Sequence, residues 1–169
     1  LDALAELRKR QIKIFIATGR PYHIINNLGN ETFDGYITVN GGCCLTADLE
    51  VIYKNPIPAD NITSLLDFLE GDNPFPCMAA TAECMYINYI DENVEKILEL
   101  IDISSQGQVK KLKEIGEKEV LQLMGYFDNN REGKILAEVL PGCEATRWSP
   151  LFTDIVAKGN SKQIGIDKI

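Results

Sequence analysis

Apolar residues recur at helical spacing in several parts of the chain. Leu1, Leu4 and Leu7 fall on one face of a helix expected over residues 2–10. The same spacing predicts three later helices, with the stripes Ile62–Leu65–Leu66–Leu69, Val94–Ile97–Leu98–Ile101 and Ile135–Leu136–Val139. Asp91 and Asp128 stand directly before the last two of these stripes, where an aspartate can cap a helix.

Other apolar runs are short and rich in β-branched residues, which is typical of strands. Residues 12–17 have no polar face and predict a buried parallel strand. Further strands are expected over 36–39 and 120–127, and as antiparallel pairs over 43–54, 77–90 and 144–157. No element is predicted for residues 104–119, because their pattern is ambiguous.

The first strand ends at Thr18-Gly19-Arg20-Pro21. Pro21 suits the first turn of a helix, which we expect over residues 22–28. Open α/β sheets bind ligands at the carboxyl ends of their strands, where helix N-termini also attract anions. A hydroxyl, a glycine and a guanidinium at such a corner indicate phosphate binding. The alternative is an ordinary turn between a strand and a helix.

A second corner lies near the end of the chain, where the strand of residues 151–157 runs into a turn at Gly159. Asn160 or Ser161 can cap the helix that follows, and Lys162 then falls in its first turn. A lysine there opposes the helix dipole, unless an anion is bound at the same point. A solvated surface lysine is the alternative.

The order of these patterns predicts an α/β protein with two domains. Residues 1–57 contain two successive strands that end in glycine-rich turns, as in a parallel sheet, and Pro56-Ile57-Pro58 is expected to be a linker. Residues 58–157 alternate helices with antiparallel strands, as in an α+β domain, and residues 158–169 return to the first domain. Both ends of the chain lie in periodic segments, so we expect a piece of a longer polypeptide.

Composition narrows the possible partners. The net charge of the 169 residues is −8 and the basic residues are scattered, so nucleic acid and anionic membranes are unfavourable partners. No run is apolar enough to span a bilayer and no signal peptide is present. The five cysteines lack a Cys-x-x-Cys spacing, which favours reduced thiols in a cytoplasm. The sequence carries no signal for an oligomeric state.

Three stretches resemble the Cof-type members of the haloacid dehalogenase superfamily, particularly its sugar phosphatases. They are residues 14–21, which resemble the second motif, residues 35–42, which resemble the segment before the cap, and residues 154–162, which resemble the approach to the third motif. The resemblance implies a partial Rossmann-like core with an inserted α+β cap domain. It also implies hydrolysis of small phosphorylated metabolites, such as sugar phosphates, by an aspartyl nucleophile and Mg²⁺.

The resemblance also assigns roles to residues. It implies that Thr18 and Lys162 hold the transferring phosphoryl group catalytically, together with the backbone of Gly19. Arg20 and Asn40 are weaker substrate-binding candidates near the mouth between cap and core.

Arg147, beside Trp148, is another weak substrate candidate because both could line a sugar pocket, although a tryptophan there is more often part of the core.

The first and fourth motifs of that superfamily are missing from these residues. No Asp-x-Asp occurs in the chain, so the resemblance places the nucleophile and the Mg²⁺ ligands outside it, and we expect no metal ligand among the 169 residues. The isolated chain should therefore be inactive. The alternative is a non-catalytic module that binds phosphorylated ligands or a partner protein.

Overall fold

The computed structural model describes residues 2–26, 28–100 and 109–169. The chain forms two compact units, one made of Leu1–Asn55 with Gly159–Ile169 and the other of Pro56–Lys158. We call them unit 1 and unit 2 and describe each by itself.

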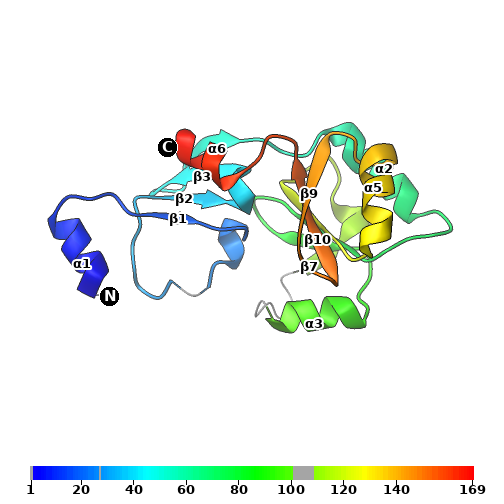
Figure 1. Ribbon diagram of the computed structural model, residues 1–169, viewed down its shortest axis with the longest axis horizontal. Coiled ribbons are helices and arrows are strands. Elements are labelled where there is room, and N and C mark those ends of the chain that lie inside the picture. Colours follow the sequence, from blue (N-terminus) through cyan, green and yellow to red (C-terminus); the bar gives the residue numbers. More distant parts are fainter. Residues whose placement is uncertain (1, 27, 101–108) are drawn as a thin grey trace. The chain divides into compact units, whose positions relative to one another are not determined.

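Unit 1 contains a four-stranded sheet with the order β1-β2-β3-β4 (Figure 1). The strands β1 (Phe15–Ala17) and β2 (Gly35–Thr38) pair in parallel, as the sequence predicts. The strands β3 (Cys43–Thr46) and β4 (Val51–Lys54) form the expected antiparallel hairpin. Two helices accompany the sheet, α1 (Asp2–Lys9) at the start of the chain and α6 (Lys162–Asp167) at its end.

The expectation that residues 12–17 are buried is wrong. The side chain of Ile12 is 46% exposed and that of Phe15 is 37% exposed. Within the described part of the chain β1 is an edge strand that pairs only with β2, so its other edge has no neighbouring strand. The parallel pairing was predictable from the β-branched run, whereas burial depends on neighbours that a local pattern does not contain.

The helix expected over residues 22–28 is also wrong. Only a three-residue 3-10 helix forms, η1 (Tyr22–Ile24), and Pro21 precedes it in an extended conformation. Ile25 is extended as well, and no side chain caps η1. Two β-branched isoleucines followed by Asn26 have low helix propensity, which explains why the turn does not propagate.

Unit 2 is built on a six-stranded sheet with the order β7-β6-β5-β8-β10-β9. Its pairs are antiparallel except for β6 and β7. The strands are β5 (Cys77–Ala80), β6 (Met85–Ile87), β7 (Val109–Lys111), β8 (Gln122–Gly125), β9 (Cys143–Ser149) and β10 (Phe152–Ala157). The predicted pairs over 77–90 and 144–157 are therefore confirmed.

Helices α2 (Ala59–Leu69) and α5 (Asn129–Glu138) bury their apolar stripes in one hydrophobic core with this sheet. Ile57 belongs to the same core, which anchors the proline-flanked segment to unit 2. The third helix, α3 (Glu92–Leu100), begins where Asp91 accepts hydrogen bonds from the N–H groups of Asn93 and Val94. Asp128 caps α5 in the same way, so both predicted caps are confirmed.

Some of the ambiguous region has structure. A 3-10 helix, η3 (Leu112–Glu114), follows β7 and buries Leu112. Residues 104–108 of that region, and Ile101 of the predicted stripe, lie outside the described residues. Among the helices that the structure describes, none has the length and apolar character needed to cross a membrane.

Candidate phosphate-binding site

The loop after β1 presents the first group of predicted site residues. The Thr18 N–H continues the parallel ladder by donating to the Ile37 carbonyl at 2.8 Å. The Thr18 hydroxyl oxygen accepts the N–H of Arg20 at 3.1 Å, which closes a tight turn around Gly19. Because a hydroxyl also has a proton to give, Thr18 remains able to donate to a ligand.

The loop after β2 contains η2 (Val39–Gly41) and has an unusual backbone. Val39, Asn40 and Gly41 have φ angles of 49°, 54° and 93° in succession. Asparagine and glycine tolerate this left-handed region, but a β-branched valine is strained there. Strain of this kind persists only where surrounding contacts impose it, and it is frequent at functional sites.

Hydrogen bonds tie these two loops together. The Asn40 N–H donates to the Thr18 carbonyl and the Val39 N–H donates to the Arg20 carbonyl, both at 3.2 Å. A Cβ atom at Gly19 would lie 3.0 Å from the Asn40 side-chain oxygen, so glycine lets the two loops approach closely. The structure therefore brings Thr18, Gly19 and Asn40 side by side.

The third part of the site is the start of α6. Ser161 caps this helix, because its hydroxyl oxygen accepts the Ile164 N–H at 3.1 Å, and this decides between the two predicted caps. Asn160 instead exchanges hydrogen bonds with Asn55, at 2.9 Å and 3.0 Å. Gly41 packs so closely on α6 that a Cβ atom there would overlap the Ser161 carbonyl oxygen.

Contacts beneath α6 hold it against the sheet. A Cβ atom at Gly165 would overlap the Ile37 side chain, so the helix rests on β2 through a glycine. The buried Cys44 thiol donates to the Gly165 carbonyl at 3.6 Å. Burial raises the pKa of Cys44, which keeps the thiol protonated as that donor.

Lys162 is the first residue of α6, and its side chain is exposed. No hydrogen bond or ion pair joins this side chain to another residue of the described ranges. Gly41 contacts the backbone of Ser161 and Lys162, while Asn40 contacts Thr18 and Gly19, so the loop after β2 links both predicted corners. The loop after β2 thus has the Thr18 turn on one side and the backbone at the start of α6 on the other. A hydroxyl, backbone N–H groups and a lysine are residue types that suit an anion.

The side chain of Arg20, another substrate candidate from unit 1, bonds to a residue of its own loop. The Arg20 guanidinium donates to the Asn26 side-chain oxygen at 3.3 Å, and its backbone supports the turn around Thr18. A role for Arg20 or Asn40 in contacting substrate stays a prediction.

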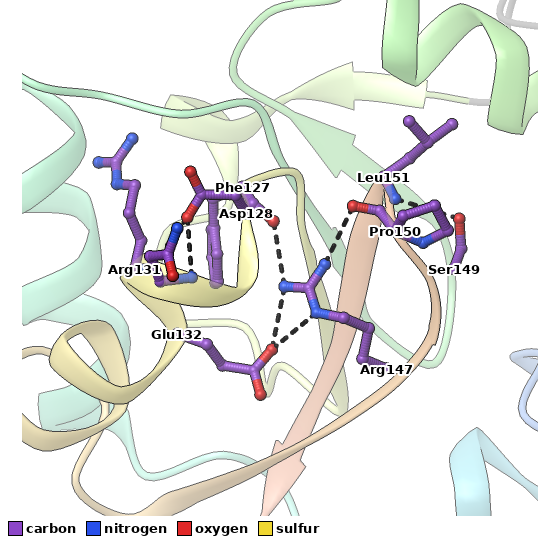
Figure 2. Close-up of polar contacts among 9 residues, drawn as sticks. Phe127, Asp128, Arg131, Glu132, Arg147, Ser149, Pro150 and Leu151 are labelled. Atoms are coloured by element: carbon purple, nitrogen blue, oxygen red, sulfur yellow. Dashed lines mark hydrogen bonds and ion pairs between the residues drawn. The ribbon is translucent and has the colours of Figure 1, made fainter.

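Arg147 lies in β9 of unit 2 and is held by several contacts (Figure 2). Its Nε and Nη2 atoms donate to Glu132 at 3.1 Å and 3.0 Å, Nη2 also donates to the Phe127 carbonyl, and Nη1 donates to the Pro150 carbonyl. These bonds fasten β9 to α5 and to the turn before β10. A substrate would have to compete with them, and substrate binding by Arg147 stays a prediction.

A polar group that sequence reasoning missed lies near Trp148. Trp148 is 57% exposed, so the alternative that it belongs to the core is wrong. Its indole N–H donates to Asp154 at 3.1 Å, and the Gln122 amide donates to the other carboxylate oxygen at 2.8 Å. These residues come from β9, β10 and β8, and only the register of the strands brings them together.

Asp154 is only 9% exposed, and its pKa is raised because burial outweighs the two hydrogen bonds. The folded chain therefore retains this proton to higher pH than the unfolded chain does. The resulting stability is fully present below the unfolded pKa and is lost as the pH rises through the folded pKa. Above the folded pKa the ionised carboxylate thus reduces the stability of unit 2.

Asp154→Asn should accordingly stabilise the chain at pH 7. Removing the charge while keeping the shape would raise Tm by roughly 2–4 °C for a gain of about 1 kcal/mol. The difference in Tm between Asp154→Asn and the wild type should vanish near pH 3, where the wild-type carboxyl is protonated. Thermal melts across this range provide the measurement, with the exposed Asp167→Asn as control; a variant less stable at pH 7 would contradict the argument.

The described residues do not form a metal centre. No group of three or more His, Cys, Asp or Glu side chains with metal-binding geometry is present in residues 2–26, 28–100 and 109–169. Thr18, Gly19, Asn40 and Lys162 are neutral or cationic and do not suit Mg²⁺, which prefers carboxylate oxygens.

The whole chain, residues 1–169, matches the family of haloacid dehalogenase-like hydrolases. The chain belongs to this family. Its α/β fold agrees with that of solved family members, which confirms the predicted fold class.

Individual relatives agree with this assignment. "Putative phosphatase YkrA" of Bacillus subtilis (strain 168) is 32% identical over 178 residues, which cover 98% of this chain and 63% of the relative. The HAD subclass IIB sugar phosphatase BT4131 is 36% identical with a TM-score of 0.83, covering 99% of this chain and 65% of that one.

The phosphatase BT1666 from Bacteroides thetaiotaomicron is 33% identical with a TM-score of 0.82, and the match covers 99% of this chain and 62% of that one. The chain thus spans slightly less than two thirds of the length of these relatives.

Proposed function

We propose that the intact polypeptide is a Mg²⁺-dependent phosphomonoester hydrolase acting on small phosphorylated metabolites, with sugar phosphates as the preferred class. The observation that supports this proposal is that the loop after β2 contacts both the Thr18-Gly19 turn and the backbone of Ser161 and Lys162. Similarity to a protein described as a sugar phosphatase supports the substrate class.

In this proposal Thr18 and Lys162 bind the phosphoryl group that is transferred. The Thr18 hydroxyl donates to one phosphoryl oxygen, and the Lys162 ammonium group offsets the charge on the others. Phosphoryl transfer places negative charge on the equatorial oxygens in the transition state, and groups fixed at that position stabilise it. Gly19 leaves room for the phosphoryl group near the backbone.

The nucleophile in this proposal is an aspartate outside the 169 residues, and it forms an aspartyl-phosphate intermediate. The Mg²⁺ ligands are also proposed to lie outside, and no group of three or more His, Cys, Asp or Glu side chains that could hold a metal is found in the described ranges.

The proposal includes the division into a core of residues 1–57 and 158–169 and an α+β cap of residues 58–157. The two compact units support a division close to this one, although Pro56, Ile57 and Lys158 belong to unit 2. A cytoplasmic location is also part of the proposal, supported by the free cysteines at 43, 44, 77, 84 and 143. Neither nucleic acid nor membrane is proposed as a partner.

The 169-residue chain should not hydrolyse p-nitrophenyl phosphate in the presence of Mg²⁺, whereas the full-length protein should. The physical reason is that Thr18 and Lys162 can bind a phosphoryl group but cannot replace the missing nucleophile. Phosphate release by both proteins, with and without EDTA, is the measurement.

Turnover by the short chain that EDTA abolishes would contradict the placement of the nucleophile. A full-length protein that binds sugar phosphates without hydrolysing any would instead support the alternative of a non-catalytic module.

A further inference from the structure

Unit 2 contains a buried carboxylate that has no cation beside it. Asp154 is 9% exposed, and the two groups that bond to it, the Trp148 indole and the Gln122 amide, are neutral. Within the described ranges no Lys, Arg or His forms an ion pair with it. Buried carboxylates are normally paired with a cation, because an isolated buried charge is unfavourable.

The surroundings of Asp154 have more acceptors than donors. Gln122 is 5% exposed, and its side-chain oxygen is buried without a hydrogen-bond partner among the described residues. Each carboxylate oxygen of Asp154 accepts one bond and has capacity for another. A group that brings several donors and a positive charge would satisfy both residues.

The local backbone and the indole also favour a ligand site. The register of β9 and β10 shifts between Phe152 and Asp154, and such bulges often re-aim a side chain next to a functional site. Trp148 is fixed by its bond to Asp154 and by edge-to-face packing on Phe152, with ring centroids 4.8 Å apart. Trp148 as a residue nevertheless stays 57% exposed, which leaves an apolar surface beside the carboxylate.

We propose that Asp154, Gln122 and Trp148 form a binding site for a small organic molecule that carries a primary ammonium group. The ammonium group would donate to the Asp154 carboxylate and the Gln122 side-chain oxygen, and the carbon atoms next to it would contact the Trp148 ring. Only a small group can reach a carboxylate this deeply buried. This site lies wholly in unit 2 and does not depend on the proposed phosphatase activity.

Trp148 is the only tryptophan of the chain, so its fluorescence reports on this site alone. The 169-residue chain is titrated with glucosamine, which carries an ammonium group. Glucose, which has a hydroxyl in place of that ammonium group, and KCl at equal ionic strength are the controls. We expect a saturable change in emission with glucosamine and none with the other two. In NMR spectra the single indole N–H signal should shift along the same binding curve.

Asp154→Asn removes the charge with little change in shape and should weaken glucosamine binding about tenfold or more, since a hydrogen bond to a charged group contributes roughly 1.5–3 kcal/mol. Glu144→Gln is the matched control, because Glu144 is an exposed carboxylate on the same strand as Trp148, and it should change binding less than about twofold.

An equal response to glucose or KCl, no saturable response to glucosamine, or an equal loss in both variants would overturn the proposal. If Asp154→Asn does not fold, the indole N–H shift in the wild-type chain still decides between these outcomes.

Discussion

Lys162→Met in the full-length protein should lower kcat by about 10²–10³-fold, which corresponds to roughly 3–4 kcal/mol of lost transition-state stabilisation. Lys162 begins α6, where its charge is unfavourable with respect to the helix dipole, and no protein group in the described ranges pairs with it. A phosphoryl group bound beside Thr18 would supply the missing negative charge. Methionine keeps most of the volume without the charge.

Folding should be almost unaffected by this substitution, because the Lys162 side chain is exposed. Lys158→Met is the control: it removes another exposed lysine four residues earlier and should cost little activity. Phosphate release and thermal stability are measured for both variants. If Lys158→Met were the inactive variant, the assignment of Lys162 would be wrong. If both variants stayed active, the proposal that these residues form a phosphate site would be wrong.

Gly41→Ala should destabilise unit 1 by about 3 kcal/mol or more, a large effect for one methyl group. Gly41 has a φ angle of 93°, which disfavours any Cβ atom, and the added Cβ would also overlap the Ser161 carbonyl. Relief of this overlap requires α6 to move away from the loop after β2. The same movement would separate Lys162 from Thr18, so activity of the full-length variant should fall as well.

Gly159→Ala separates the cost of the left-handed backbone conformation from the cost of the steric overlap. Gly159 has a similar φ angle of 83°, but a Cβ atom there would meet nothing within 4 Å. We expect only the conformational cost, about 1–2 kcal/mol. Amide NMR signals from unit 1, followed in urea for both variants, measure the difference. Equal losses would mean that contact between Gly41 and Ser161 does not hold α6 in place.

Local patterns predicted the elements of unit 2 well. The apolar stripes of α2 and α3 are short-range features, and the caps at Asp91 and Asp128 act on N–H groups only two or three residues away. Such interactions depend on nearby residues, so their residue types are sufficient to indicate them.

Features that depend on distant residues were not predictable in the same way. The exposure of β1 depends on what covers it. The left-handed backbone at Val39 occurs where its N–H donates to the carbonyl of Arg20, in a loop distant in sequence. The pairing of Asp154 with Gln122 requires the register of β8 and β10, which the sequence pattern does not specify.

The candidate site lies between these cases. Thr18 and Lys162 stand at corners that the sequence marks with glycine, proline and a capping serine, so each corner was predictable by itself. The loop after β2, which contacts both corners, was not predictable as their link. The contact between Gly41 and Ser161 joins residues far apart in the chain. The resemblance to a known family assigned both residues to one site, and the contacts through Asn40 and Gly41 provide a physical basis for that prediction.

The phosphate site can be tested most directly by titrating the 169-residue chain with inorganic phosphate and following its backbone amide signals by NMR. We expect the proposed phosphate site to give saturable shifts at Gly19, Arg20, Asn40 and Lys162, and much smaller shifts in Lys162→Met. Shifts confined to other parts of the chain, or an unchanged response in Lys162→Met, would contradict it.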